Sequence, residues 1–324
     1  MAQDKWNKSQ RMLTILNILT SGKKVSKIEL ANRFKVDERS IQRDISDLNR
    51  YLAESEDVIQ REITYNVQQK VYEISGGVEE PLTDGELFAL VKILLESRAL
   101  VKEEMDGIIK KLTQYSQEQN QQEISDFILN EQYHYQPLQH KRPLVDMLLN
   151  FMAYIKQQKK IKISYIRQDQ KVVERTIIPL NIMFSEYYFY LATYTREDAT
   201  MPIMYRLDRI LNYEALEETF RINYATRFEE GEFRKRIQFM YPGNLMRIKL
   251  KFWGASLEAL LDRLPTARVI EQDETSTTVQ VEVYGPGIKM WILSQADRIE
   301  VLEPVSLREE MKNTILNMAK IYGD

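Results

Sequence analysis

Residues 26–52 read SKIELANRFKVDERSIQRDISDLNRYL and contain the start signals of two successive helices. Ser26 and Glu29 have the spacing of a capping box, in which a serine oxygen and a glutamate carboxylate satisfy each other's free backbone amides. Asp37 is placed to cap a second helix. Two well-capped helices only a few residues apart predict a helix-turn-helix, a motif whose second helix can enter the major groove of DNA.

The second predicted helix has an apolar stripe, and its opposite face is polar. Ile41, Ile45, Leu48 and Leu52 recur at helical spacing. Arginine and glutamine can read guanine and adenine edges, and arginine also binds phosphate. The alternative is an ordinary amphipathic helix with a solvated face; the paired caps and a helical stretch at 11–19 favour DNA reading. The residues predicted to contact DNA here are Ser26, Lys27, Arg39, Ser40, Gln42, Arg43, Ser46 and Arg50.

The positive charge of the chain is concentrated in its first 51 residues. Residues 1–51 carry 11 Lys and Arg against 6 Asp and Glu, a balance of +5, whereas the whole chain has a net charge of −3. A basic segment on a larger acidic body is the expected footprint of a small DNA-reading module.

A hairpin is predicted directly after the second helix. Residues 58–65 and 70–74 alternate between apolar and polar side chains, and the turn lies between them. A hairpin in this place is typical of the wing of a winged-helix domain. Arg61 and Lys70 could therefore reach the DNA backbone; the alternative is that both are solvated surface charges.

The composition argues against an enzyme. The chain has no cysteine and only 11 glycines, none in a phosphate-binding loop. His134 and His140 have a spacing that suits neither a helical metal pair nor a catalytic triad. We therefore expect no catalytic residue, no metal and no cofactor. No apolar run is long enough to span a membrane and the first residues lack a signal-peptide core, so a cytoplasmic location is expected.

The order of elements predicts an α+β multidomain chain. Residues 1–77 form the winged helix-turn-helix, and residues 78–136 form a helical connector that serves dimerisation or, alternatively, only domain packing. Residues 137–225 form a small barrel-like sheet after one helix. Residues 226–324 have the β-α-β-β-α-β order of a ferredoxin-like fold, followed by one more helix.

One predicted strand is dense in tyrosine. By strand alternation Tyr188, Tyr190 and Tyr194 share one face, and Phe189 and Leu191 share the other. One face can therefore pack as core while the other presents phenols to a polar partner.

These strands resemble the WYL domain of bacterial transcription regulators. The family's signature is a Trp-Tyr-Leu triplet after a proline-containing strand and before a segment like Arg-x-Asp-Arg-Ile. In this chain the three parts are Pro179-Leu180, the triplet Phe189-Tyr190-Leu191, and Arg206-Leu207-Asp208-Arg209-Ile210, with phenylalanine in place of tryptophan. The N-terminal winged helix is similar to the family's DNA-binding part. The last segment resembles its WCX-type extension through Trp291-Ile-Leu-Ser and Leu302-Glu-Pro.

The resemblance implies a ligand-responsive transcription regulator that acts as a homodimer on an inverted-repeat operator, with a small Sm-like β-barrel as the WYL domain. It implies a nucleic-acid or nucleotide effector and, as the leading mode of action, repression; a phage-defence operon is one target that the family's known roles suggest. The alternative is a sensor of single-stranded nucleic acid, either an activator that responds to DNA damage or an accessory subunit of a partner enzyme. A nuclease is the weakest possibility because no convergent acidic cluster is visible.

The effector residues implied by the resemblance are Tyr165, Arg175, Tyr188, Tyr190, Arg206 and Arg209. Arginine offers bidentate donors to phosphate, and tyrosine offers a stacking face and a hydroxyl. The alternative is that Arg206 and Arg209 pair internally with Asp208 or Glu214. In one straight strand the two arginines would also lie on opposite faces, so both reach a pocket only if the strand ends near Asp208.

Overall fold

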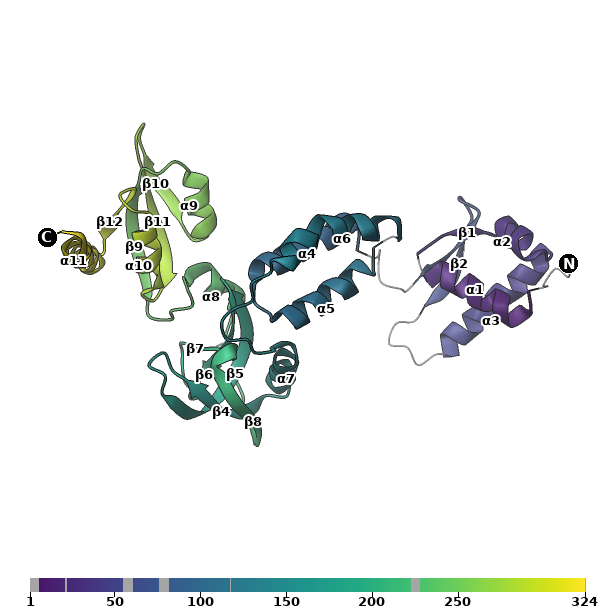
Figure 1. The fold of residues 1–324 in the computed structure, drawn as a ribbon, viewed down its shortest axis with the longest axis horizontal. Helices are drawn as coiled ribbons and strands as arrows, with labels where there is room; N and C mark the ends of the chain where they lie inside the picture. The colour runs from purple at the N-terminus through teal and green to yellow at the C-terminus, as the bar shows by residue number, and fades with distance from the viewer. Residues whose placement is uncertain are drawn as a thin grey trace. The chain divides into compact units, whose positions relative to one another are not determined.

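A computed structural model describes residues 6–20, 22–54, 61–75, 82–116, 118–222 and 228–323. The described residues form eleven α-helices and three antiparallel sheets, which confirms a mixed class of helices and strands (Figure 1). Contacts divide the chain into a first unit, residues 1–91 with 110–128, and a second unit, residues 92–109 with 129–324. The predicted domain boundaries at 77 and 225 lie outside the described residues, so the four-domain division stays a prediction.

The first unit begins with what we call the N-terminal module, residues 8–75. Its apolar core lies between three helices and a small sheet whose strand order is β1-β3-β2. Val25 pairs with Tyr72, which ties the segment before α2 to the hairpin. Part of the first predicted hairpin strand, residues 58–60, lies outside the described residues. The elements are α1 (Lys8–Thr20), β1 (Val25–Ser26), α2 (Lys27–Phe34), α3 (Glu38–Glu54), β2 (Glu62–Asn66) and β3 (Val71–Ser75).

Three further helices, α4 (Asp84–Ser97), α5 (Lys102–Thr113) and α6 (Glu118–Tyr133), follow the N-terminal module. Thr83 and Glu86 start α4 with reciprocal bonds: Thr83 N–H donates to the Glu86 carboxylate at 2.7 Å, and Glu86 N–H donates to Thr83 Oγ1 at 3.3 Å. Residues of these helices belong to both units. A role in dimerisation stays a prediction.

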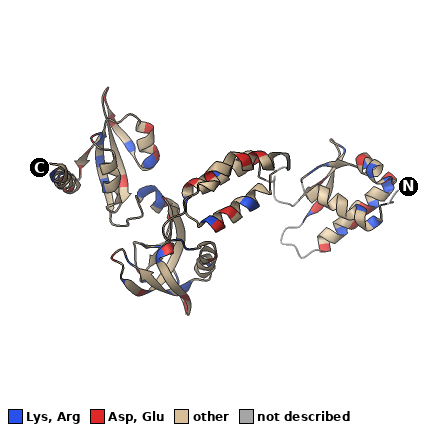
Figure 2. Cartoon of the chain, viewed as in Figure 1, with Lys and Arg blue, Asp and Glu red and all other residues tan. Residues whose placement is uncertain are grey.

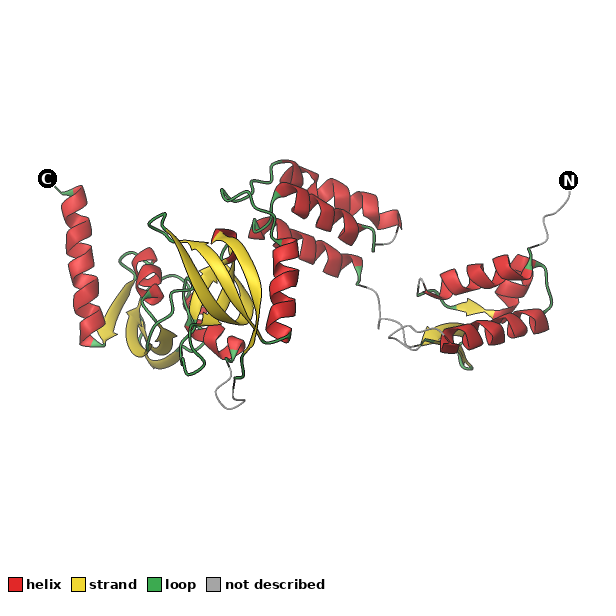
Figure 3. Ribbon diagram, turned by 90° about the horizontal axis from the view of Figure 1, so that it is seen from below, coloured by secondary structure: helices red, strands yellow, loops and turns green. Residues whose placement is uncertain are grey.

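The second unit contains a strongly curved five-stranded sheet with the strand order β7-β6-β5-β4-β8 (Figure 3). The predicted barrel is wrong, because among the described residues β7 and β8 are the two open edges of this sheet. The short 3-10 helix η1 separates these strands and redirects the chain, so they form no ladder with each other. The elements are α7 (Val145–Lys156), β4 (Lys159–Ile166), β5 (Val172–Ser185), β6 (Tyr188–Tyr194), β7 (Ile203–Arg206), η1 (Leu207–Arg209) and β8 (Ile210–Thr219).

Strand β5 runs six residues past Pro179, to Ser185. The pairing with β6 shifts between Pro179 and Asn181. Proline has no N–H to give to a ladder, and a bulge lets the strand continue past it. The strand can therefore bend there and reach the turn that leads into β6.

The last part of the second unit has the predicted β-α-β-β-α-β order and a four-stranded sheet of order β10-β11-β9-β12. Its core is a continuous apolar cluster that includes Phe252, Leu260 and Trp291. Helix α8 precedes the sheet and was not predicted. No described helix is long and apolar enough to cross a membrane. The elements are α8 (Glu230–Arg236), β9 (Leu245–Phe252), α9 (Leu257–Arg263), β10 (Arg268–Gln272), β11 (Thr277–Tyr284), α10 (Gly287–Ser294), β12 (Ile299–Glu303) and α11 (Val305–Tyr322).

Candidate functional site

Helix α3 presents a row of polar side chains opposite its buried stripe. Ile41, Ile45, Leu48 and Leu52 are buried in the core of the N-terminal module, as their spacing predicted. Figure 2 shows Lys and Arg along α2 and α3. Because the buried stripe fixes the rotation of the helix, the opposite side chains all face solvent. The exposed residues on this face are Arg39, Gln42, Arg43, Ser46 and Arg50.

The predicted caps set the start of both helices. Ser26 Oγ accepts from Glu29 N–H at 3.1 Å, and Glu29 Oε2 accepts from Ser26 N–H at 2.9 Å. The pKa of Glu29 is lowered, chiefly by the bond from the Ser26 backbone. Asp37 Oδ1 accepts from Ser40 N–H at 2.7 Å. Lys35, between the helices, takes a left-handed conformation with φ 54° and ends α2. Local capping therefore fixes the turn between α2 and α3.

Three of the predicted DNA contacts, besides the exposed Arg50 with its 3.9 Å pair to Asp47, already have structural partners. The Ser26 hydroxyl accepts the capping bond, and the Ser40 amide donates to Asp37. Lys27 Nζ lies 3.3 Å from a carboxylate oxygen of Glu38, and 30% of its side chain is exposed. These groups shape the turn first, and we rank them below the exposed α3 row as candidates for contact with DNA.

Asn49 attaches the hairpin to α3. Its Nδ2 donates to the Ile63 carbonyl at 2.9 Å, and its Oδ1 accepts from Ile63 N–H at 2.7 Å. No sequence signal pointed to this bond, because it joins residues fourteen positions apart in different elements. Lys70 is exposed in the hairpin turn with φ 56°, whereas Arg61 is half-buried and its Nε has no hydrogen-bond partner. Of the two predicted wing residues, only Lys70 is therefore plainly presented to solvent.

The second candidate site lies on β6 and β7. We call Tyr188, Tyr190, Arg206 and Asp208 the arginine–tyrosine cluster. Tyr190 and Arg206 are direct partners in the β6–β7 ladder. The guanidinium carbon of Arg206 lies 3.3 Å from the centre of the Tyr188 ring, which is a close cation–π contact. The predicted pairing of tyrosine and arginine is therefore present for these three residues.

Asp208 holds the guanidinium of Arg206 from its other side. Arg206 Nε donates to Asp208 Oδ1 at 3.1 Å, and Nη2 donates to Oδ2 at 2.7 Å. Internal pairing, the alternative interpretation of Arg206, is therefore real. This pairing uses only Nε and one N–H of Nη2, so the other guanidinium donors stay available to a ligand. The Arg206 side chain is 20% exposed. The pair and the ring together fix one orientation of a partly accessible cation.

The environment of the cluster is poorly solvated. Burial raises the pKa of Tyr190, and the charge of Arg206 opposes this. Burial alone would lower the pKa of Arg206, but the hydrogen bonds and charge of Asp208 more than offset it, so that the net shift is upward. In a poorly solvated site, charge-assisted hydrogen bonds gain strength.

His140 and Arg142 support the cluster, and no sequence signal pointed to them. Arg142 donates to the carbonyls of Asp208, Ile210 and Leu211, and its own N–H donates to His140 Nδ1 at 3.0 Å. Burial lowers the pKa of His140, and the charge of Asp208 partly offsets this. Arg142 lies 66 to 69 positions before the three carbonyls that it binds, and a single sequence does not reveal contacts over such a separation.

The other predicted effector residues do not join this cluster. Tyr165 packs edge-on against Tyr205 at 4.8 Å between ring centres, and the charge of nearby Arg175 acts on the Tyr205 hydroxyl. Tyr205 precedes Arg206 in β7, so the two side chains point to opposite faces. Arg209 lies half-buried in η1. The six predicted effector residues therefore lie in two groups and a separate arginine, and their role in effector binding stays a prediction.

The prediction that Tyr194 shares an exposed phenol face is also wrong. Tyr194 is 4% exposed and packs in an apolar cluster with Ile178 and Phe220. Burial raises the pKa of its hydroxyl. Strand alternation gave the correct face, but it could not show that the far end of this face is covered. The condition for Arg206 and Arg209 to reach one pocket, a strand end near Asp208, is met, since β7 ends at Arg206; their common role stays a prediction.

The described residues contain no group of three or more histidine, aspartate and glutamate side chains that could hold a metal ion. The absence of a cofactor and of catalysis stays a prediction.

Comparison with known proteins identifies two domain families within the second unit. Residues 146–215 match the WYL domain, and residues 244–319 match the WCX domain. A comparison with curated proteins found no match.

Two solved structures are among those similar to the chain. Proteasome accessory factor B/C (PafBC) of Arthrobacter aurescens is 15% identical with a TM-score of 0.28, and the match covers 94% of this chain and 45% of that chain. A CRISPR Cas-related protein is 16% identical with a TM-score of 0.38, and the match covers 76% and 75% of the two chains. The chain thus spans less than half the length of the PafBC chain.

Proposed function

The chain contains a WYL domain and a WCX domain, and from this premise we propose that it is a DNA-binding transcription regulator that responds to a nucleic-acid or nucleotide effector. The observation that carries the proposal is the exposed row on α3, namely Arg39, Gln42, Arg43, Ser46 and Arg50. These side chains combine phosphate binding with readout of base edges. We further propose a winged helix in which Lys70 contacts the phosphate backbone.

Effector recognition is assigned to the arginine–tyrosine cluster. Arg206 offers a preoriented cation, and the rings of Tyr188 and Tyr190 lie next to it. A phosphate oxygen can take the guanidinium donors that Asp208 leaves free, while a base packs on tyrosine. The same three residues therefore suit both parts of a nucleotide.

We propose that the chain acts in the cytoplasm as a homodimeric repressor and performs no catalysis. Two DNA-reading helices related by a twofold axis would require an inverted-repeat operator with half-sites about 34 Å apart, or a multiple of this. Control of a phage-defence operon belongs to the same proposal and follows from the resemblance to the family alone.

A gel-shift titration with the DNA upstream of its own gene tests the DNA-reading face. Arg39→Ala with Arg43→Ala removes two exposed guanidinium groups, and we expect binding to weaken at least tenfold. The slope of log K against log salt should fall by about one for each phosphate that the variant no longer binds. Arg247→Ala with Arg298→Ala is the matched control, because these side chains are 73% and 62% exposed in the second unit. Unchanged affinity and slope in the α3 variant would show that α3 does not read DNA.

The second candidate function is a sensor of single-stranded nucleic acid, which the arginine–tyrosine cluster favours by itself. In that case the Arg39→Ala, Arg43→Ala variant keeps its affinity for single-stranded oligonucleotides, and the unaltered chain binds no operator. Loss of oligonucleotide binding in Arg206→Met, with retained operator binding, would instead assign the cluster to effector recognition in a regulator.

A further inference from the structure

We infer that the WCX domain, together with Glu186 of the WYL domain and Phe239, forms a small-ligand site shaped for a planar heteroaromatic ring such as a purine base. The site is a cavity of ≈ 390 Å³ lined by residues of β9, α9 and α10, by the residue after α10, by Phe239, and by Glu186 from the β5–β6 turn. Its volume lies in the range of small-molecule sites. No member of the arginine–tyrosine cluster lines it, so it is a separate site.

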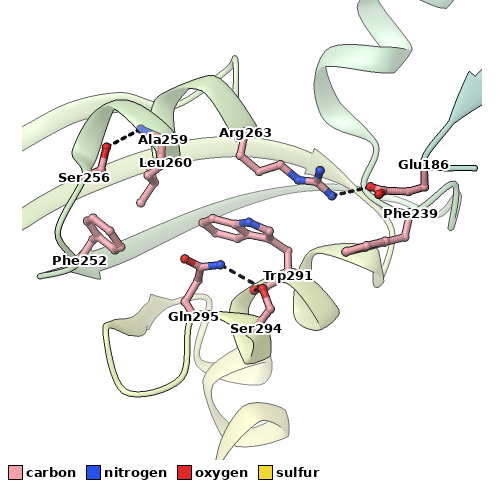
Figure 4. A pocket seen from close by; sticks show the side chains of 10 residues that line it. All are labelled: Glu186, Phe239, Phe252, Ser256, Ala259, Leu260, Arg263, Trp291, Ser294 and Gln295. Atoms are coloured by element: carbon pink, nitrogen blue, oxygen red, sulfur yellow. Dashed lines mark hydrogen bonds and ion pairs between the residues drawn. The ribbon is translucent and has the colours of Figure 1, made fainter. Parts of the chain in front are cut away.

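The apolar wall of the cavity is fixed by the domain core. Phe252 and Trp291 are each 6% exposed, and both belong to the apolar cluster that holds the sheet and helices together. Figure 4 shows the indole of Trp291 at the centre of the site, between Phe252 and Phe239. A wall of aromatic rings that is already ordered can contact a flat ring without first being rearranged.

A charged pair forms one end of the cavity. Arg263 Nη2 donates to Glu186 Oε1 at 3.0 Å, and the guanidinium lies over the Phe239 ring at 5.1 Å. The Nε atom of Arg263 is enclosed and has no hydrogen-bond partner, a state shared among the described side chains only with the Nε of Arg61. Protein atoms cover this Nε atom, so a ligand would meet the other guanidinium N–H groups of Arg263, whose side chain is 36% exposed.

Uncharged polar groups also line the cavity, next to Trp291. Ser294 Oγ donates to the Trp291 carbonyl at 2.6 Å and accepts from Gln295 Nε2 at 3.0 Å. Gln295 also carries an amide oxygen that can accept a hydrogen bond. The cavity therefore combines a charged pair, uncharged donors and acceptors, and an aromatic wall.

This arrangement selects against two simpler ligands. A free phosphate would meet the Glu186 carboxylate beside the arginine, and like charges repel. A hydrocarbon ring would shield the charged pair from water without replacing its hydrogen bonds. A purine suits the charged pair and the rings: its edge carries adjacent acceptors and N–H donors, which match arginine and glutamate, and its faces pack against aromatic side chains.

Fluorescence of Trp291 in the full-length chain tests the site. The chain has three tryptophans, so Trp6→Phe with Trp253→Phe leaves Trp291 as the sole emitter. We expect guanosine to change its emission saturably and ribose 5-phosphate to leave it unchanged. If ribose 5-phosphate binds as well as guanosine, or if guanosine produces no saturable change, the proposal is wrong.

Two variants in this background locate the binding. Arg263→Met keeps the apolar stem and removes the charged donors, so guanosine affinity should fall at least tenfold. Ala259→Met fills the cavity from α9 and should abolish binding. Glu258→Met is the matched control, because Glu258 is exposed on the same helix and does not line the cavity. Equal binding by the Ala259→Met and Glu258→Met variants, both with unaltered unfolding midpoints, would overturn the assignment.

Discussion

Two arginine–aspartate pairs, one in each unit, share a bidentate geometry but have different surroundings. Arg11 and Asp44 join α1 to α3 inside the core of the N-terminal module, where 10% and 2% of the two side chains are exposed. Arg206 and Asp208 are only two residues apart, and 20% and 5% of their side chains are exposed. In the second pair the guanidinium also lies on the Tyr188 ring.

The difference separates a structural pair from a recognition pair. The Arg11–Asp44 pair spans 33 positions and has little access to water, so its charges can serve only the packing of α1 on α3. The Arg206–Asp208 pair is local and stabilises no distant contact. It instead orients one guanidinium whose other donors remain accessible. Burial and sequence separation together, rather than the presence of an ion pair, therefore indicate which arginine can meet a ligand.

The largest effect is expected from Asp44→Ala. This substitution leaves the Arg11 charge buried without a partner, which costs about 3–5 kcal/mol of unfolding free energy. Denaturant unfolding of the full chain, monitored by hydrogen exchange in residues 8–54, measures the loss.

The matched control for this variant is Asp47→Ala on the same helix. Asp47 pairs with Lys8 at 2.7 Å, but the lysine side chain is 59% exposed, so a loss of at most about 1 kcal/mol is expected. A loss of similar size in both variants would show that burial does not distinguish the two pairs.

A smaller effect is expected from Asp208→Ala. Removing the two charged hydrogen bonds to Arg206 should cost about 2 kcal/mol, because this arginine can turn toward water whereas Arg11 cannot. Denaturant unfolding monitored in the second unit measures it. Asp169→Ala is the control, since the Arg167–Asp169 pair spans the same two residues and is 55% and 43% exposed. A cost as large as that of Asp44→Ala would make the Arg206 pair structural as well.

The features that could be predicted from the sequence are those that depend on nearby residues. Caps and apolar stripes are local, so Ser26, Asp37 and the buried face of α3 were predictable, as was the element order of the last domain. The signature around residues 189–210 located the WYL domain. These signals depend only on neighbours within a few positions along the chain.

What the sequence could not give depends on distant partners. The open edges of the five-stranded sheet, the burial of Tyr194 and the bond from Asn49 to Ile63 follow from tertiary packing. The separation of Arg206 from Tyr165 depends on which face each strand turns to the core. Strand alternation can group residues within one strand, but it cannot align the faces of two strands.

A third substitution isolates the ring beneath Arg206. Tyr188→Leu removes the cation–π contact at 3.3 Å and should cost about 1 kcal/mol of unfolding free energy. Tyr188→Phe keeps the ring and should cost less. Tyr187→Leu is the neighbouring control, because the guanidinium of Arg98 lies farther from that ring, at 5.7 Å. Equal costs for the leucine variants at 187 and 188 would mean that the close stacking adds nothing.

The smallest effect is a pH dependence carried by His140, which lies beside Arg142 and within the field of Asp208 and Arg206. Burial lowers its pKa in the folded chain below the ordinary value near 6.5. The unfolded chain therefore binds the proton first as pH falls, so the stabilising contribution is fully present above about pH 6.5 and is lost progressively as pH falls below that value toward the lowered pKa of the folded chain. His140→Gln should flatten the slope of unfolding free energy between about pH 7 and pH 5. His134→Gln, at an exposed position, should leave that slope unchanged; if it flattens the slope equally, the titration does not belong to the cluster.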